Sequence, residues 1–552
     1  MGKSKKTWVT SVVILVFLCG LHAFSDEKTE KIDKIFERFD STHTPGVSVA
    51  IIKEGSIIYK KAYGMASLEL GVPNTTQTVF RLGSVSKQFT AACIGMLVQE
   101  EKLSLNDPIT KFFPELPQEL YGSVEVRHMI HHMSGIRDSE ALYPVMNIEY
   151  SQWYTHDMLL DMLASQKSLD FTPGERIEYS NSAYTLLALI VERVSEKPFH
   201  EFAEERIFDP LGMENTHIQT SYDTFIPHRA AGYEPSSKGY GNWMTNNQLV
   251  GHDAVYSSVE DMYHWVQAFF NKTLGEGLMA MMTEPSKFND GTTNNYACGI
   301  VVDHYKGLKT YAHSGWYVGY LAFLIIFPEQ EFSVVCLSNV VEGSPARACL
   351  DIAEIYLEEE IKTSLNELSK KRRVLDKTLF DKLVGDYVGI DWGGSLPLVV
   401  EDEKLKIKGA PWSFEVSPFG INEFINYDRR LKLRVVSGLD GEDDVMIDLL
   451  SSMGSQGRFK KTKKVSLGEE ELQRYAGEYR SEEIEAHAEI TILEGKILIQ
   501  VGRLSGKLTP FGKNDFDAGW GLVKFERDDS GEVKSFGLSR YGFQNVLFER
   551  IN

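Results

Sequence analysis

The stretch FRLGSVSKQFTA, residues 80–91, places Ser84 and Lys87 three positions apart at the head of an apolar run that extends to about residue 101. This spacing of apolar residues predicts a helix, so both side chains lie on one face of one helical turn. A hydroxyl beside an amine is a nucleophile beside its base. An S-x-x-K pair has only two fixed positions, and it therefore predicts catalysis only if partners follow downstream.

Two further short motifs follow at separations that only a tertiary fold could close. They are Tyr179-Ser180-Asn181 and His313-Ser314-Gly315. Each motif alone has a structural explanation: Ser84 as a helix N-cap, Tyr179 as a core aromatic residue and His313 as an ordinary strand residue. Because all three motifs occur in one chain, catalysis explains them better than three separate structural roles do.

Together the three motifs resemble the active-site set of the serine β-lactamase and penicillin-binding protein superfamily. The branch is the class C and DD-peptidase branch, which uses Y-x-N where class A enzymes use S-D-N. Four flanking segments also match recurring segments of the superfamily: HMSGI at 132–136, PGERIE at 173–178, PLGM at 210–213 and SSVEDM at 257–262. The resemblance covers about residues 30–360.

The resemblance implies a role for each motif residue. Ser84 is the nucleophile, and Lys87 and Tyr179 act as one coupled acid–base unit. Asn181 orients Lys87 and the substrate amide. The backbone N–H groups of Ser84 and Trp316 form the oxyanion hole. Neither a metal ion nor another cofactor is implied.

The segment at 313–315 departs from the commonest pattern of the superfamily, because many relatives have K-T-G where this chain has H-S-G. A lysine there is a permanent cation for a substrate carboxylate, whereas histidine, with a free pKa near ~6.5, is mostly neutral at pH 7. We therefore expect His313 to weaken the dependence on a substrate carboxylate. Gly315 is expected to let the substrate backbone approach closely.

Beyond about residue 378 the helical pattern fades into short alternating strands with Gly and Asp turns, and this part of the chain repeats itself. Equivalent residues recur 92 positions later: Gly385 and Gly477, Tyr387 and Tyr479, Lys404 and Lys496, Ile407 and Ile499, and Phe424 and Phe516. Two tandem barrel-like, lipocalin-like units are the simplest interpretation, because closure removes exposed strand edges.

We predict an α+β fold in which an antiparallel sheet flanked by helices precedes the two β-rich units. The predicted domains are a signal peptide at 1–25, a hydrolase domain at 26–360, a charged linker at 361–378, and β-rich units at 379–465 and 466–552.

This architecture resembles that of D-stereospecific aminopeptidases, in which a loop from the last unit closes one side of the active site. The acidic segment 514–517 is our candidate for that loop. Its Asp517 aligns with Ile425 in the first copy, so it is a charge that the sister unit lacks. Asp517 is either a holder of a substrate ammonium or part of an ordinary solvated turn.

The N-terminus has three lysines in its first six residues, an apolar run over about 9–21 and small residues before an acidic segment, which is typical of a secretory signal peptide. We expect a secreted or periplasmic protein. A lipid anchor on Cys19 is disfavoured because Leu18 is not the small residue of a lipoprotein cleavage site. The formal charge of −20 works against nucleic-acid binding.

The remaining cysteines, Cys93, Cys298, Cys336 and Cys349, lie in apolar segments without metal-binding spacing. We interpret them as small buried residues, and one disulfide stays open as an alternative.

The sequence thus predicts an exported serine hydrolase that acts through an acyl-enzyme on peptides or small amides, with D-amino-acid substrates favoured. A DD-carboxypeptidase, a β-lactamase or an esterase of the same fold stays open, as does a penicillin-binding sensor without turnover. The expected partner is a small peptide or amide, and a homodimer is compatible with the sequence.

Overall fold

The computed structural model describes residues 27–39, 41–371, 377–391, 393–408, 413–420, 423–426, 431–437, 445–450, 456–462 and 465–551. The predicted signal peptide at 1–25 and Cys19 lie outside these residues. No helix in the described part of the chain is long and apolar enough to cross a membrane.

The first region is built on a six-stranded antiparallel sheet with the order β12-β13-β14-β15-β1-β2. The strands are β1 (Val47–Lys53), β2 (Ser56–Tyr63), β12 (Val301–Tyr305), β13 (Leu308–Tyr317), β14 (Tyr320–Phe327) and β15 (Phe332–Ser338). Alternate residues of β1 enter two separate cores: Ala50 and Ile52 face one core, and Val49 and Ile51 face the other. Both faces of the sheet are therefore covered.

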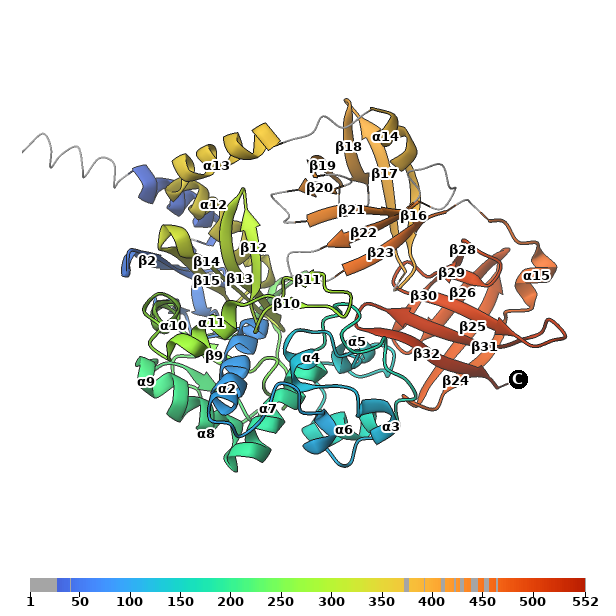
Figure 1. The fold of residues 1–552 in the computed structure, drawn as a ribbon, viewed down its shortest axis with the longest axis horizontal. Helices are drawn as coiled ribbons and strands as arrows, with labels where there is room; N and C mark the ends of the chain where they lie inside the picture. The colour runs from blue at the N-terminus through green and yellow to red at the C-terminus, as the bar shows by residue number, and fades with distance from the viewer. Residues whose placement is uncertain are drawn as a thin grey trace, which may run out of the picture.

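Helices supply both covers (Figure 1). Helix α12 (Pro345–Tyr356) belongs to the smaller core, whereas α10 (Val259–Asn271), α2 (Lys87–Gln99) and α7 (Asn181–Ser195) contribute to the larger one. In α2 every residue from Lys87 to Leu97 is buried, so this helix lies in the interior of the domain rather than on its surface.

The other helices and short strands of this region surround these elements. The helices are α3 (Gln118–Tyr121), α4 (Val126–Ile130), α5 (Ser139–Leu142), α6 (His156–Ser165), α8 (Phe199–Ala203), α9 (Asp209–Leu211) and α11 (Glu276–Thr283). The strands are β3 (Met65–Ser67), β4 (Val72–Pro73), β5 (Phe80–Arg81), β6 (His217–Ile218), β7 (Tyr233–Ser236), β8 (Gly239–Asn242), β9 (Val255–Ser257), β10 (Ser286–Lys287) and β11 (Thr293–Asn294).

The segment predicted as a charged linker is largely helical where it is described. Helix α13 (Glu358–Lys371) covers most of it, and α14 (Lys377–Leu383) follows. Ile361 and Leu365, four residues apart on α13, pack on the smaller core. This apolar pair gives the segment a reason to be helical that its many charges conceal in the sequence. The precise domain boundaries stay a prediction.

The first β-rich unit is a closed eight-stranded barrel. Its strands are β16 (Gly385–Gly389), β17 (Ser395–Glu401), β18 (Lys404–Lys408), β19 (Ser413–Gly420), β20 (Glu423–Asn426), β21 (Leu431–Ser437), β22 (Met446–Leu450) and β23 (Gln456–Lys461). The predicted barrel architecture is confirmed for this unit.

The second unit is a nine-stranded sheet with the order β27-β26-β25-β24-β32-β31-β30-β29-β28, preceded by α15 (Glu469–Gln473). Its strands are β24 (Gly477–Ser481), β25 (Ala486–Leu493), β26 (Lys496–Val501), β27 (Leu504–Lys507), β28 (Thr509–Pro510), β29 (Asp515–Asp517), β30 (Leu522–Arg527), β31 (Val533–Arg540) and β32 (Phe543–Arg550). The sequence repeat maps β16 onto β24 and β18 onto β26, so the predicted fold class is confirmed.

The second unit docks on the first region through a buried ionic cluster. Arg137 Nε lies 3.1 Å from Asp170, and Arg137 Nη1 lies 2.7 Å from Glu483 of the second unit. Arg137 Nη2 also donates to the Gln544 carbonyl, at 2.9 Å. Figure 1 shows β31 and β32 beside the part of the first region that contains α5.

Candidate active site

Ser84 lies in a short 3₁₀ turn, Gly83–Ser86, immediately before α2. Two glycines bring this turn against strand β13. A Cβ atom on Gly315 would stand 1.9 Å from the Leu82 carbonyl oxygen, and one on Gly83, whose φ is +52°, would stand 2.6 Å from the Trp316 nitrogen. The structure therefore brings together the two chain segments that carry the predicted oxyanion donors, the backbone N–H groups of Ser84 and Trp316.

Lys87 is fully buried in the first turn of α2. Its Nζ lies 3.0 Å from Ser84 Oγ, 2.7 Å from Asn181 Oδ1 and 2.9 Å from the His252 carbonyl oxygen. Burial lowers the pKa of Lys87 to about 7. A neutral amine has two hydrogens and one lone pair. If it donates to Asn181 and His252, its lone pair is left to accept the proton of Ser84.

Helix α7 positions Asn181. Ser180 caps this helix by accepting a hydrogen bond from the Ala183 backbone N–H, at 3.2 Å, so Asn181 becomes the first helical residue. The Ser180 backbone N–H in turn donates to His132 Nδ1, at 3.1 Å. The H-M-S-G-I segment noted in the sequence therefore helps to hold the Y-S-N motif in place through His132.

Tyr179 is buried against Lys87 and His132. Lys87 Nζ lies 4.7 Å from the centre of the Tyr179 ring, and the rings of His132 and Tyr179 are 4.0 Å apart. Burial raises the pKa of Tyr179 well above its usual range, and its interaction with Ser84 opposes part of that rise. Tyr179 is thus better suited to hold a proton than to remove one, which favours Lys87 as the base in the coupled pair.

His313 lies beneath the site and does not line the cavity. Its Nδ1 lies 2.6 Å from the Ser314 carbonyl oxygen, so this nitrogen carries the proton, and its Nε2 accepts from the Tyr296 hydroxyl at 2.9 Å. Burial lowers the pKa of His313 to about 3. His313 therefore supplies no cation at neutral pH.

A pair of buried carboxyl groups, absent from the predicted site, lies beside Asn181. Asn181 Nδ2 donates to Asp138 at 3.1 Å and to Glu140 at 3.2 Å. Burial and the nearby charge of Glu140 raise the pKa of Asp138 to about 8. The sequence signal was an acidic pair two residues apart, directly after the segment 132–136, and only the fold shows that it turns toward Ser84.

Ser84 and the two carboxyl groups line a cavity of about 560 Å³. Its lining includes the polar residues Ser84, Asp138, Glu140, Asn181 and Arg540 and the aromatic residues Tyr150, Tyr179, Trp316, Tyr317 and Tyr541. Arg540 and Tyr541 come from the hairpin between β31 and β32, so the second β-rich unit completes one wall of the cavity.

Asp517 does not line this cavity. Its Oδ1 accepts hydrogen bonds from the backbone N–H groups of Gly394, at 3.0 Å, and Gly519, at 2.9 Å. The carboxylate is already used to join the two β-rich units, so the structure does not support Asp517 as the holder of a substrate ammonium. The segment from the second unit that reaches the cavity is Arg540-Tyr541, which in the sequence resembles an ordinary hairpin turn.

Gly542 clamps this hairpin to the first region. Its carbonyl accepts from the Asp138 backbone N–H at 2.7 Å, and its own N–H donates to Glu178 at 3.3 Å. Its φ is +93°, and a Cβ atom here would stand 2.6 Å from the Ala141 Cβ. Glycine therefore permits the contact that fixes the position of Arg540 and Tyr541.

The four cysteines outside the predicted signal peptide are buried and free, as the interpretation as small buried residues requires. Within the described ranges, no group of three or more His, Cys, Asp or Glu side chains is arranged to hold a metal ion.

Comparison with known families and proteins agrees with this geometry. The family model described as Beta-lactamase matches residues 32–356. Penicillin-binding protein 4* of Bacillus subtilis (strain 168) is 27% identical over 462 residues, which are 79% of this chain and 99% of that protein. Protein flp of Staphylococcus aureus (strain MW2) is 26% identical over 333 residues, 57% of this chain and 64% of that protein.

Two solved structures share the fold. The octameric penicillin-binding protein homologue from Pyrococcus abyssi superposes with a TM-score of 0.51 at 20% identity, covering 88% of this chain and 99% of its own. The D-amino acid amidase from Ochrobactrum anthropi SV3 superposes with a TM-score of 0.51 at 23% identity, covering 60% of this chain and 99% of its own.

Proposed function

This chain belongs to the Beta-lactamase family, and we propose that it is an exported serine hydrolase that acts through an acyl-enzyme on peptides or small amides containing D-amino acids. The observation that carries the proposal is the 3.0 Å contact between Lys87 Nζ and Ser84 Oγ at a lysine whose pKa burial lowers to about 7. Such a lysine can accept the serine proton near neutral pH.

The proposed reaction has two halves. Ser84 Oγ attacks the substrate carbonyl while its proton passes to Lys87, and the N–H groups of Ser84 and Trp316 stabilise the oxyanion. Lys87 and Tyr179 together return a proton to the leaving amine as the C–N bond breaks. Water then attacks the Ser84 ester, the same groups take its proton, and the acid product leaves with the serine hydroxyl restored.

Two observations support a substrate with a free ammonium group. Asp138 and Glu140 place buried carboxyl groups beside Asn181 in the same cavity as Ser84. An ammonium bound there would lower the raised pKa of Asp138 and so favour its charged form. A structural neighbour is named a D-amino acid amidase, and amides of that class carry an α-ammonium. The D-stereochemistry and the peptidase rather than esterase activity rest on these two supports.

The decisive experiment combines turnover with labelling of the nucleophile. We expect hydrolysis of D-Ala-p-nitroanilide and labelling of one serine by a fluorophosphonate, seen by intact mass. Ser84→Ala should abolish both. Ser86→Ala is the matched control, because the hydroxyl of this neighbour accepts from the Val255 backbone N–H and does not line the cavity, and it should keep the label. Labelling that survives Ser84→Ala contradicts the nucleophile.

A panel of substrates separates this proposal from its rivals. A D-Ala-D-Ala peptide, a cephalosporin and a short p-nitrophenyl ester test for a DD-carboxypeptidase, a β-lactamase and an esterase. Hydrolysis of the ester alone contradicts the peptidase proposal. A stable adduct of penicillin on Ser84 without turnover supports the sensor instead. Export is tested by sequencing the N-terminus of the mature protein, where a chain that still begins at Met1 contradicts a cleaved signal peptide.

A further inference from the structure

The cavity that contains Ser84 holds one cation that the proposed reaction does not use. Among its lining residues, Arg540 is the one arginine or lysine. The other charged groups there are acidic, and one of them, Asp253, is already paired with the buried Arg81 at 2.6 Å. Arg540 therefore faces a cavity in which a substrate is expected.

Arg540 lacks a protein partner at the atom that matters. Its Nη1 is buried and has no hydrogen-bond partner among the described residues, and no described carboxylate forms an ion pair with it. Arg540 as a whole is half-buried, and this partial burial lowers the pKa of its guanidinium. A buried donor without a partner costs free energy, so a ligand that supplies an acceptor would bind with an advantage.

The backbone contact of Gly542 with the first region fixes the position of the hairpin that carries Arg540. Arg540 ends β31, Gly542 starts the return through β32, and the Gly542 carbonyl is bonded to the Asp138 backbone N–H at 2.7 Å. The guanidinium is thus carried to the cavity wall by a hairpin that contacts the active-site segment directly.

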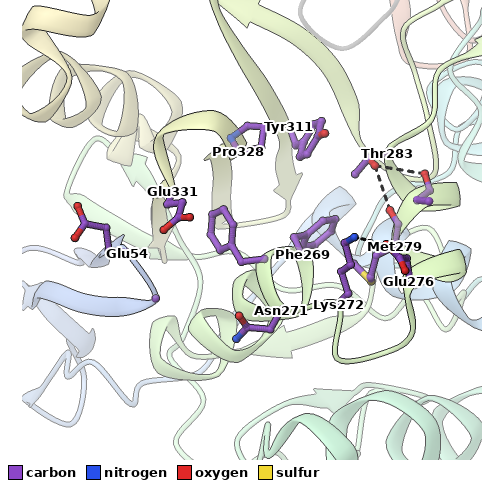
Figure 2. Close-up of a pocket in the computed structure, with 13 residues that line it drawn as sticks. Glu54, Phe269, Asn271, Lys272, Glu276, Met279, Thr283, Tyr311, Pro328 and Glu331 are labelled. Atoms are coloured by element: carbon purple, nitrogen blue, oxygen red, sulfur yellow. Dashed lines mark hydrogen bonds and ion pairs between the residues drawn. The ribbon is translucent and has the colours of Figure 1, made fainter.

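Another hollow of the first region lacks this feature. It measures about 540 Å³ and lies between α10, α11 and the turns at one end of the sheet, which contribute Glu54 and Glu331 (Figure 2). Its lysine, Lys272, is paired with Glu276, and the Thr283 hydroxyl donates to the Met279 carbonyl at 3.1 Å. The cation of that hollow is thus already paired with a carboxylate of the protein, unlike Arg540.

We propose that the Arg540 guanidinium binds a carboxylate of the substrate, and that it supplies from the second β-rich unit the cation that the H-S-G motif does not provide. A guanidinium matches a carboxylate with two parallel hydrogen bonds. Among the proposed substrates, peptides with a free carboxylate are therefore favoured over small amides without one, and the weaker carboxylate dependence expected from His313 is offset. This inference rests on the proposed function, because it places that carboxylate in the Ser84 cavity.

The test measures binding rather than turnover, so that it stands apart from the chemistry at Ser84. Acetyl-D-alanine and its primary amide are titrated calorimetrically into the full chain, with acetyl-L-alanine and inorganic phosphate as further arms. We expect the carboxylate to bind about 10- to 100-fold more tightly than the amide. Arg540→Gln should remove this preference, and Arg540→Lys should keep part of it.

Arg503→Gln is the matched control. Arg503 belongs to the same unit, contacts the first region at the Ile148 carbonyl, and does not line the cavity. It should keep the preference, and thermal melting of each variant shows that it is folded.

Each outcome decides the proposal. Equal binding of acid and amide by the wild-type chain, or a preference that survives in folded Arg540→Gln, overturns it, and phosphate binding as tight as acetyl-D-alanine overturns the carboxylate assignment. A preference for the acid with no hydrolysis of any peptide supports Arg540 and contradicts the proposed function. Tighter binding of acetyl-L-alanine supports Arg540 and contradicts the D-stereochemistry.

Discussion

The two β-rich units arise from one repeated sequence, yet the structure gives them different relations to Ser84. Their cores are equivalent: Tyr387 and Tyr479 are both fully buried, and each donates its hydroxyl proton to the carbonyl four residues earlier, at 2.9 and 2.7 Å. Their surfaces are not. The second unit lines the cavity through its β31–β32 hairpin, and no described residue of the first unit does.

The contacts with the first region show the same difference. The first unit is joined to it by partly exposed ion pairs, among them Lys432 with Asp303 at 2.9 Å. The second unit is joined by Arg137, Asp170 and Glu483, whose side chains are at most 3% exposed. A duplicated core thus preserves the fold, while a few residues at one turn and one buried contact determine which copy serves the active site.

The largest expected effect comes from breaking the buried contact. Arg137→Ala leaves Asp170 and Glu483 buried without a counter-charge and should lower the free energy of unfolding by about 3–5 kcal/mol. The equivalent break at the first unit, Lys432→Ala, removes a partner of Asp303 that is itself 33% exposed and should cost about 1 kcal/mol or less. Urea unfolding measures both, and equal losses would contradict the contrast.

Next in size is displacement of the hairpin. Gly542→Ala puts a methyl group 2.6 Å from the Ala141 Cβ and should push Asp138 and the hairpin apart. We expect kcat/KM for a peptide to fall about 100-fold, since small displacements at a site have effects of this order. Gly531→Ala is the control, because Gly531 also has a positive φ, +86°, but would contact nothing within 4 Å. Equal losses of activity in both variants would show that backbone strain at a positive φ, and not displacement of the hairpin from the first region, is the cause.

A smaller effect concerns pH. Only neutral Lys87 can take the proton of Ser84, so activity on a neutral p-nitrophenyl ester should rise as pH increases through about 7, about tenfold per unit on the acid side. Glu140 favours the charged form of Lys87. Glu140→Gln should therefore move the rise to lower pH, whereas Asp391→Asn, in the first unit, should leave it in place. A rise that moves equally in both variants would contradict this assignment.

The smallest effect should be alike in the two units. Tyr387→Phe and Tyr479→Phe each remove one buried hydroxyl whose hydrogen bond goes to a backbone carbonyl, and each should destabilise the protein by about 1 kcal/mol. Peptide hydrolysis should be unchanged in both variants. A loss at Tyr479 that greatly exceeds the loss at Tyr387 would show that the two cores are not equivalent.

Much of the fold and of the candidate site could be predicted from local sequence patterns. The S-x-x-K spacing on a helix, the Y-S-N motif and the 92-residue repeat are short-range or periodic signals. The family match, the closed barrel and the nine-stranded sheet agree with them. The helical linker was missed because Ile361 and Leu365 are few among many charges. Two roles stayed open for Asp517 in the sequence, because an acidic residue in a turn does not reveal that its carboxylate accepts hydrogen bonds from backbone N–H groups.

The sequence by itself determined the family and predicted the chemistry proposed at Ser84, since the residue types that can form and break an acyl-enzyme stand in motifs whose order and spacing are readable. Tertiary structure alone decided what surrounds that chemistry. Asp138, Arg540 and Gly542 come from segments some 400 residues apart in the chain, and their roles depend on burial and on contacts between the second unit and the first region. The burial of a side chain and the identity of its hydrogen-bond partners depend on tertiary packing, so a local sequence pattern does not predict them.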